Sequence, residues 1–411
     1  MPRRRVAVTG LGAVSPLGHG VDALFAGLRE GRTGIAPCPQ LDGVEGLRPR
    51  IAGLAPPVDA TAIPRKLRRS MSAMSVYALA ACREAIAQAG LTEREVTGGD
   101  LGLVYGSTLG SPQTMEDFFR QYLPGRSIEQ VKSMLFFRVM GHSAAANVAQ
   151  ALGLSGHTLA PAAACATGCM AVGAAFDMVA SGRQPAVLCG GCDEFHPLTA
   201  ATFDIIQAAS FRYNDDPAGM PGPFDAGRDG VVCAEGAGAL VLEDLERARA
   251  RGAAVLAEVA GWAGLADPQN LATPGVDAMA ACLRRALADA GVDPAEVDYV
   301  NAHATGTALG DPAECAAIAA VLGPDAPVSS FKGHLGHTMA ASGALELAAV
   351  VRSLGRGLAL PTRNLRDPDP DCRCVRLLTE ALPLPMRVIA KNSFALGGMN
   401  AVIILRSYPR D

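Results

Sequence analysis

Short apolar runs typical of buried strands alternate with helix-like segments along this chain, and the alternation occurs twice. The strand-like runs are residues 6–9, 101–105 and 186–189 in the first half, and 255–262, 297–301, 328–330 and 388–392 in the second. Such alternation predicts an α/β fold in which layers of helices cover sheets. We expect an N-terminal half over residues 1–252 and a C-terminal half over residues 253–411, with reactive side chains just after strands and at helix starts.

Alanine and glycine are abundant in the segments with helical spacing, notably residues 143–152, 165–181 and 337–354. Small side chains let a helix lie close to a sheet or to another helix. We therefore expect a layered core with close helix contacts.

Composition excludes several classes of protein. The 411 residues carry a formal net charge of −4, and no basic stripe with interleaved aromatic residues indicates nucleic-acid binding. Apolar stretches are interrupted by polar residues well short of a membrane span, and no apolar run follows the basic start of the chain. A soluble, cytoplasmic enzyme with no membrane partner is the expectation.

Eleven cysteines are scattered without the dense spacing of a disulfide scaffold. Cys189 and Cys192 form a Cys-x-x-Cys pair, which raises a metal or redox site as an alternative. A zinc site would need further ligands at suitable spacing, and none lies close in the sequence. Because the pair follows an apolar run, we expect it to lie in a buried strand, and we expect no metal.

Gly10, Gly12 and Gly18 follow the first strand-like run and resemble part of a dinucleotide-binding loop. The third glycine of that motif is missing, and no helix begins at once. The pattern instead favours a tight turn.

Cys165 is the strongest candidate for a catalytic residue. It stands in Ala-Cys-Ala-Thr-Gly at the start of an apolar helix. Free N–H groups and the helix dipole at such a position favour the thiolate, which is the nucleophilic form. A packed core thiol is the alternative. Cys169, one turn later, is expected to serve packing.

His303 is the second candidate, in the segment Asn-Ala-His-Ala-Thr-Gly-Thr. The hydroxyls of Thr305 and Thr307 could bind an amide-containing arm. Asp311 precedes a proline and stands three residues before Glu314, a pattern that indicates a helix cap rather than a catalytic acid.

His337 ends Lys332-Gly-His-Leu-Gly-His and is expected to open a helix, which would keep its ring neutral and able to donate to an oxyanion. His334 is expected to be structural. Only four lysines occur in the chain, so the place of Lys332 beside these histidines suggests a functional role.

Residues 392–400, Asn-Ser-Phe-Ala-Leu-Gly-Gly-Met-Asn, are rich in glycine. A β-turn between two strands is the expectation from spacing, and its backbone N–H groups near Leu396 could donate to an oxyanion.

Taken in order, these motifs closely resemble those of the β-ketoacyl–acyl carrier protein synthases, condensing enzymes of fatty-acid and polyketide assembly. The resemblance rests on Ala-Cys-Ala-Thr-Gly, Asn-Ala-His-x-Thr-x-Thr with Gly-Asp-x-x-Glu, Lys-x-x-x-Gly-His and Asn-Ser-Phe-x-x-Gly-Gly-x-Asn. It spans essentially the whole chain. It implies a thiolase-like fold, with five alternating layers (αβαβα) built from two similar halves, that forms a dimer.

The resemblance also implies roles for individual residues. Cys165 would carry the acyl chain, and His303 and His337 would stabilise the enolate formed when malonyl–acyl carrier protein loses carbon dioxide. The N–H groups of Cys165 and Leu396 would hold the second oxyanion. Lys332, paired with Glu314, would organise the site. Thr305 and Thr307 would contact the pantetheine arm, and Phe224 would line the malonyl side of the site. No cofactor is implied beyond the carrier's phosphopantetheine.

Two departures from many fatty-acid relatives affect substrate choice. The gate Gly-Phe-Gly-Gly is replaced by Ala395-Leu396-Gly397-Gly398, and the segment after Asp193 resembles that of synthases in polyene or aryl-polyene pathways. Acyl-pocket or dimer-interface positions are expected at Leu109, Met134, Phe136 and Phe137.

Three other readings stay open within this fold. The chain could be the active subunit of a heterodimer with a chain-length factor, or a non-catalytic interaction subunit, although such subunits typically lack the cysteine that stands here at position 165. A thiolase would use a second cysteine near the C-terminus, in a Cys-x-Gly setting that the closing motif lacks.

Overall fold

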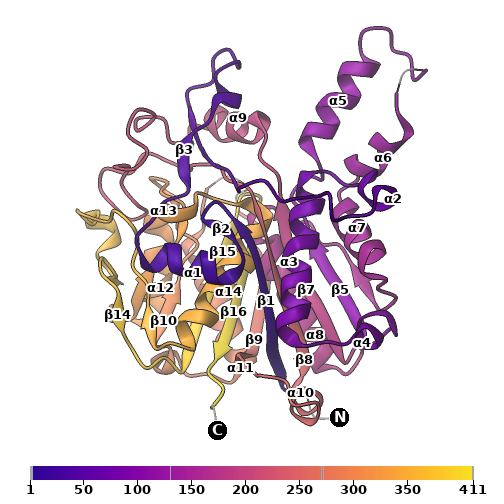
Figure 1. Cartoon of the computed structure of the whole chain (residues 1–411). Coiled ribbons are helices and arrows are strands. Elements are labelled where there is room, and N and C mark those ends of the chain that lie inside the picture. Colours follow the sequence, from indigo (N-terminus) through magenta and orange to yellow (C-terminus); the bar gives the residue numbers. More distant parts are fainter. Residues whose placement is uncertain (1–2, 130, 270, 272, 410–411) are drawn as a thin grey trace.

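Within the described residues, one mixed sheet of twelve strands runs through the molecule (Figure 1). The computed structural model describes residues 3–129, 131–269, 271 and 273–409. The sheet's first-half strands are β1 (Val6–Ser15), β2 (Gly18–His19), β5 (Leu101–Gly106), β6 (Thr158–Leu159), β7 (Ala186–Asp193) and β8 (Gly236–Asp244). Its second-half strands are β9 (Ala257–Ala266), β10 (Tyr299–Asn301), β11 (Pro327–Ser329), β13 (Arg376–Leu377), β15 (Val388–Ala395) and β16 (Met399–Arg406).

The two halves share one topology. They join where β1 pairs antiparallel with β9. Outward from that junction the strands run β1-β8-β7-β5-β6 on one side and β9-β16-β15-β10-β11 on the other. In both series the first two neighbouring pairs are antiparallel and the next two parallel. The expected construction from two similar halves is therefore confirmed.

Helices lie between and outside the two halves of the sheet. The inner layer is α8 (Thr167–Ala180) and α14 (Ser342–Leu354), which contact each other and strands of both halves. The outer layers are α3 (Ala73–Ala89) and α7 (Ser143–Leu152) on one side, and α11 (Val276–Ala290) and α12 (Gly310–Leu322) on the other. These are the five layers expected of a thiolase-like fold.

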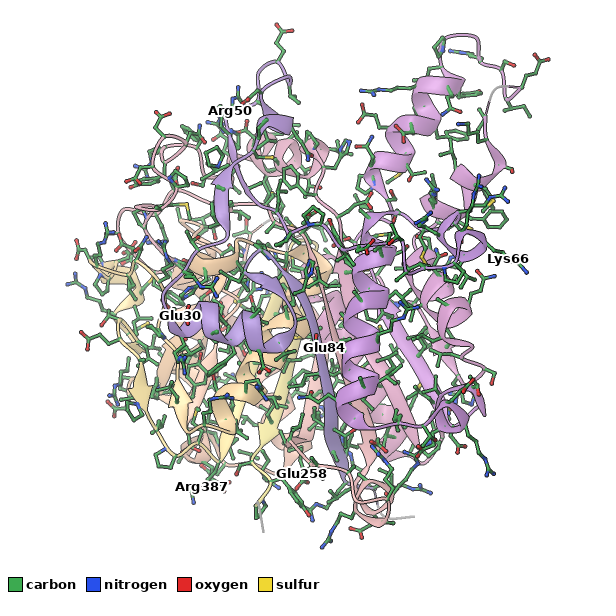
Figure 2. All side chains as sticks on the ribbon, in the orientation of Figure 1. Glu30, Arg50, Lys66, Glu84, Glu258 and Arg387 are labelled. Carbon is green, nitrogen blue, oxygen red and sulfur yellow. The ribbon has the colours of Figure 1, made fainter. Side chains whose placement is uncertain are left out.

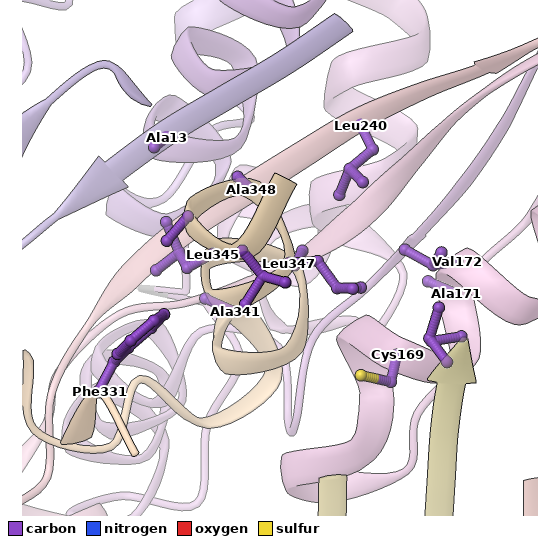
Figure 3. Close-up of a cluster of buried hydrophobic side chains, with 14 of the residues drawn as sticks. Ala13, Cys169, Ala171, Val172, Leu240, Phe331, Ala341, Leu345, Leu347 and Ala348 are labelled. Carbon is purple, nitrogen blue, oxygen red and sulfur yellow. The ribbon is translucent and has the colours of Figure 1, made fainter. Parts of the chain in front are cut away.

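The two inner helices, α8 and α14, approach each other closely at glycine residues. A Cβ atom on Gly168 would lie 2.7 Å from the carbonyl oxygen of Ala340, and one on Gly343 would lie 2.6 Å from the backbone nitrogen of Cys169. Figure 3 shows side chains of the surrounding core, including Leu345 and Leu347 of α14. The expectation of close helix contacts from small residues is confirmed, and it matters because both helices begin at the site described below.

The tight turn expected at the first glycines is wrong for Gly10 and Gly12. Gly10 and Gly12 do not form a turn but continue β1, where a Cβ atom would overlap the carbonyl oxygens of Ala85 and Ala81 in α3. Glu84 of α3 also accepts a hydrogen bond from the N–H of Ala13 at 2.9 Å (Figure 2). These glycines serve the contact of a helix with a strand rather than a nucleotide.

A helical hairpin projects from the body of the molecule (Figure 1). It consists of α5 (Pro112–Tyr122) and α6 (Ser133–Val139). Phe136 and Phe137 are 61% and 47% exposed.

Smaller elements complete the described chain. The helices are α1 (Val21–Arg29), α2 (Arg65–Arg68), α4 (Glu93–Thr97), α9 (Pro197–Ile205), α10 (Leu245–Ala250) and α13 (Lys332–Leu335). The strands are β3 (Ile35–Pro37), β4 (Ile51–Gly53), β12 (Leu358–Ala359) and β14 (Leu382–Pro383). Within the described ranges, no helix has both the length and the apolar character required to cross a membrane.

Candidate active site

Cys165 lies in a strained turn just before α8. A short 3-10 turn, Ala164–Ala166, leads into the helix, and Ala164 has a φ of 45°, which is uncommon for a residue with a Cβ atom. Thr167 holds this turn, since its hydroxyl accepts from the N–H of Ala163 at 2.8 Å and donates to the carbonyl of Ala164 at 2.7 Å. The thiol is thereby presented at the helix start while remaining only 6% exposed.

The structure brings both candidate histidines to this thiol. The Sγ atom of Cys165 and a ring nitrogen from each of His303 and His337 lie within 4.8 Å of one another. His303 follows β10, and His337 lies between α13 and α14. The three groups come from loops far apart in the sequence, and the site exists only because the two halves pack together.

Both imidazoles are neutral in the folded protein. Burial lowers the pKa of His337 to about 3 and that of His303 well below its usual value, and the nearby charge of Lys332 lowers both further. His337 does not open a helix as expected, because a 3-10 turn at Met339–Ala341 separates it from α14. Its predicted neutrality holds, and burial is the main cause.

Ring nitrogens of the pair remain available for a ligand. Within the described residues, Nδ1 of His303 and both ring nitrogens of His337 are buried without a hydrogen-bond partner. A buried polar atom without a hydrogen-bond partner costs free energy, so we expect a bound polar group to form hydrogen bonds with these ring nitrogens. Neutral rings of this kind can donate to an oxygen on which negative charge develops.

Cys165 rests as a thiol. Burial raises its pKa to about 12, although the charge of Lys332 and the N–H groups of Cys165 and Leu396 act in the opposite direction. The expectation of a resting thiolate at the helix start is therefore wrong, because loss of solvation outweighs the helix terminus. The thiol must lose its proton as it reacts.

The N–H groups of Cys165 and Leu396 both approach the sulfur atom. Leu396 lies in the turn between β15 and β16, where Gly397 and Gly398 have φ values of 91° and 73°. Glycine takes such values without strain. The expected β-turn is confirmed, and an oxygen on a carbon attached to the sulfur would lie near two donors.

Lys332 does not pair with Glu314, contrary to expectation. Its Nζ atom lies 2.7 Å from Oε1 of Glu346, a buried carboxylate in α14. Lys391 lies 2.7 Å from the other oxygen of Glu346. The partner differs from the expectation because Glu346 of α14 reaches Lys332 at the start of α13 (Lys332–Leu335).

Glu314 instead holds the loop of His303. Its carboxylate accepts from the backbone N–H groups of His303 at 2.8 Å and Ala304 at 2.7 Å, and from the side chain of Asn392 at 3.0 Å. Two charge-assisted bonds to adjacent N–H groups fix the direction in which the His303 ring leaves the backbone.

Asp311 is not a helix cap, which corrects the expectation from its position before a proline. It accepts from the N–H groups of Thr305 and Gly306 at 3.0 and 3.1 Å, and from that of Phe224 at 2.9 Å. Burial raises its pKa to about 6 despite these bonds. Its carboxylate ties the loop after His303 to a second segment.

A cavity leads to the cysteine and histidines. Thr305, Thr307 and Leu396 are among its lining residues, as the proposed substrate contacts require. Phe224 is not, since it is fully buried in the core beside α12 and lies outside the lining. The malonyl-side role of Phe224 stays a prediction.

The residues expected at an acyl pocket or a dimer interface lie outside the lining of this cavity. None of the residues Leu109, Met134, Phe136 and Phe137 is part of the cavity lining. Leu109 is 54% exposed. Their role at an acyl pocket or at a dimer interface stays a prediction.

Cys189 and Cys192 do not form a joint site. Both lie in β7 as predicted, and they belong to different core clusters on opposite faces of the sheet. His334 is separate from the catalytic cluster, with Nδ1 at 2.8 Å from the carbonyl oxygen of Arg32.

Sequence reasoning missed several residues of the site. Glu346 could have been found as the one acidic residue in the apolar α14, and Lys391 as a rare lysine before the closing motif. Phe203 lines the cavity, with its ring centroid 6.5 Å from that of His337. No local pattern pointed to Phe203.

Comparison with known proteins assigns the family. Residues 3–248 match the model of the β-ketoacyl synthase N-terminal domain, and residues 256–366 match that of the C-terminal domain. The chain belongs to the β-ketoacyl synthase family, and it is an enzyme of the acyltransferase class.

Curated relatives match over nearly their whole length. The 3-oxoacyl-[acyl-carrier-protein] synthase 2 of Synechocystis sp. is 35% identical, with 99% of both chains covered. The 3-oxoacyl-[acyl-carrier-protein] synthase 1 of Escherichia coli K12 is 34% identical, with 98% of this chain and 99% of the relative covered.

Solved structures agree closely. A β-ketoacyl synthase from Burkholderia phymatum has a TM-score of 0.95 at 38% identity, covering 99% of this chain and 100% of that one. The ishigamide ketosynthase/chain length factor has a TM-score of 0.91 at 34% identity. A type II polyketide ketosynthase in complex with its acyl carrier protein has a TM-score of 0.90 at 30% identity. Both of these cover 99% of this chain and 100% of the matched chain.

Proposed function

We propose that this chain catalyses the decarboxylative Claisen condensation of an acyl group on Cys165 with malonyl–acyl carrier protein, in fatty-acid or polyene/polyketide elongation. The observation that carries the proposal is the buried cluster of one thiol and two neutral imidazoles at the end of a cavity. A condensing enzyme needs a nucleophile that is also a good leaving group and neutral donors where negative charge develops.

In the first half-reaction the Cys165 sulfur attacks the thioester carbonyl of the acyl carrier. A bond forms between sulfur and the acyl carbon, and the bond to the carrier's sulfur breaks. The N–H groups of Cys165 and Leu396 stabilise the oxyanion of the tetrahedral intermediate. The proton lost by Cys165 ends on the departing pantetheine thiol, so no net charge is left in the buried site.

In the second half-reaction the malonyl thioester occupies the cavity, with its pantetheine arm beside Thr305 and Thr307. His303 and His337 donate to the thioester carbonyl oxygen. Carbon dioxide leaves with cleavage of its carbon–carbon bond, and the electron pair forms an enolate. The enolate carbon attacks the acyl carbon on Cys165, and the bond from that carbon to sulfur breaks. The sulfur leaves as a thiolate and takes up one proton from solvent. No metal or redox cofactor takes part.

A product assay tests this reaction. The protein is incubated with an acyl–carrier protein and malonyl–carrier protein, and the β-ketoacyl product on the carrier is identified by mass spectrometry. The expected product is longer than the starting acyl group by two carbons. A product of unchanged length, with malonyl–carrier protein left intact, would contradict condensation.

We further propose that the protein acts as a dimer in the cytoplasm. The exposed Phe136 and Phe137 of the α5–α6 hairpin, and the exposed edge strand β6, offer an apolar surface and free backbone groups for a second chain. The eleven free cysteines suit a reducing compartment. Because this chain carries a complete set of candidate catalytic residues, a homodimer is the first expectation.

A heterodimer with a chain-length-factor-like subunit is the second candidate, favoured by the similarity to the ishigamide ketosynthase/chain length factor. Light scattering on the purified protein separates the two. A homodimer that forms product without another subunit supports the first, whereas a monomer without activity supports the second. A non-catalytic interaction subunit would leave the Cys165–His303–His337 cluster without a purpose.

A further inference from the structure

Two of the four lysines in this chain are buried around one carboxylate. Lys332 and Lys391 lie on opposite oxygens of Glu346, each at 2.7 Å. The side chains are 2%, 0% and 1% exposed, respectively. Taking charged groups out of water is expensive, so such an arrangement persists only where its members compensate one another.

Lys391 is held from several sides. It lies in β15, one residue before Asn392, and also donates to the backbone carbonyl of Asn392. The side chain of Asn392 in turn donates to Glu314, which fixes the loop of His303. The lysine therefore connects Glu346 with the backbone that supports the active site, although it does not itself line the cavity.

The formal charges around Glu346 indicate a role for Lys391. Four charged groups form one ion-paired and hydrogen-bonded set behind the two histidines: the ammonium groups of Lys332 and Lys391 and the carboxylates of Glu346 and Glu314, whose formal charges cancel. The carboxyl of Asp193, whose pKa burial raises to about 6, also acts on Cys165, lies outside this set and is kept in every variant below. Without Lys391 the group would carry one net negative charge. A buried negative charge would favour protonation of His303 and His337 and would oppose both the malonyl carboxylate and the enolate.

We propose that Lys391 is a positioning residue for the condensation, which pairs with the second oxygen of Glu346 and so balances the charge buried behind His303, His337 and Cys165. It acts through Glu346 and Lys332 and touches no reacting atom. The inference rests on the proposed function of the two histidines, and it adds a residue that the motifs of the active site do not include.

Electrostatic effects on neighbouring groups agree with this geometry. Burial alone would raise the pKa of Glu346, but Lys332 and Lys391 hold it at about 2. The pKa of each histidine is lowered first by burial and then by charges that include Lys391. The charged or titratable groups that face this region from the elements packed around it are Lys332, Lys391, Glu346, Glu314, Cys165, Cys169, Asp193 and Tyr299.

Charge-balance variants separate this role from packing. Lys391→Met keeps the length of the side chain and leaves one net negative charge, whereas Glu346→Gln leaves one net positive charge. The double variant Lys391→Met/Glu346→Gln restores the balance with Lys332 and Glu314. Lys66→Met, at an exposed position on the outside of the molecule, is the control (Figure 2).

The first readout is decarboxylation of malonyl-pantetheine as a function of pH, which needs no carrier protein. For Lys391→Met we expect the acid limb of the profile to move up by about one pH unit, as one buried charge at an effective dielectric constant near 20 would cause. The double variant should return toward the wild-type limb. An unmoved limb in Lys391→Met, or a double variant that is no better than the single one, would overturn the inference.

The second readout is alkylation of Cys165 by iodoacetamide at pH 8, measured by peptide mass spectrometry relative to the exposed Cys374. We expect a ratio several-fold below wild type for Lys391→Met, several-fold above it for Glu346→Gln, and near it for the double variant. If Lys391→Met does not fold, Glu346→Gln and the double variant still test the proposal. Equal alkylation ratios of Cys165 to Cys374 in these two variants would reject charge balance. If wild-type protein does not decarboxylate the malonyl thioester, the proposed function fails while the alkylation ratios still test Lys391.

Discussion

The rings of His303 and His337 meet edge to face, with centroids 5.2 Å apart and planes inclined by 80°. Protonation of one ring would place a positive charge against the other in a buried site. The pair is therefore suited to donate hydrogen bonds while neutral, and not to store a proton. In the proposed mechanism decarboxylation uses both rings, whereas acylation of the cysteine does not.

Replacement of either histidine by alanine should mainly affect decarboxylation. We expect malonyl decarboxylation to fall by a factor of about 10²–10³ for His303→Ala and for His337→Ala, as for loss of one oxyanion donor. Release of carbon dioxide from malonyl–carrier protein measures it. His334→Asn serves as the control, because His334 is also buried but lies outside the cluster. Unchanged decarboxylation in both alanine variants would reject the assigned roles.

Glu314→Gln should weaken catalysis through the position of His303. The neutral amide keeps the size of the side chain but can accept only through its single oxygen, so one of the two adjacent N–H groups loses its partner. We expect a loss of about 1–3 kcal/mol in unfolding free energy. Decarboxylation should fall while acylation of Cys165 persists. Equal losses in both half-reactions would show that Glu314 does not act through His303.

The reactivity of Cys165 should rise with pH far beyond neutrality. Since burial raises its pKa to about 12, the thiolate fraction should increase about tenfold for each pH unit between 7 and 10. Timed alkylation with iodoacetamide, quantified on the peptide that contains Cys165, measures this. A plateau near pH 8 would mean that the helix start lowers the pKa after all.

Leu396 should control access to the cysteine. It lines the cavity and is 39% exposed at the turn between β15 and β16. Leu396→Phe places a larger side chain at this point, so acylation by long donors should slow by more than acylation by acetyl–carrier protein. The ratio of the two rates is the measurement, and Leu396→Met, of similar volume, should leave it unchanged. An unaltered ratio in the phenylalanine variant would remove Leu396 from the acyl path.

Local sequence patterns predicted the cysteine and histidines of the cluster, but they did not predict the buried contacts that hold these residues in place. Cys165, His303 and His337 stand in short motifs with distinctive chemistry, and the repeated strand–helix alternation predicted the layered fold. The partner of Lys332 could not be predicted in this way, because Glu346 reaches it only when α14 packs in the inner layer. For the same reason the sequence predicted a helix cap at Asp311. In the structure its carboxylate instead accepts hydrogen bonds from two segments, one containing Thr305 and the other Phe224.

Burial is the second quantity that sequence does not provide. A helix start predicts a thiolate at Cys165, yet the pKa depends on how completely the surrounding layers exclude water. Gly10 and Gly12 show the same limit, since only the approach of α3 distinguishes their role from that of a turn. Motifs identify reactive groups, whereas their protonation states follow from tertiary packing.

If Cys165 carries the acyl chain, the protein gains the mass of one acyl group, which intact-protein mass spectrometry detects. Wild-type protein and Cys165→Ala are incubated with saturated, polyunsaturated and aryl acyl–carrier proteins. We predict a mass increase equal to one acyl group in the wild type with at least one donor, and none in Cys165→Ala. An acyl adduct of the same size on Cys165→Ala would contradict the account.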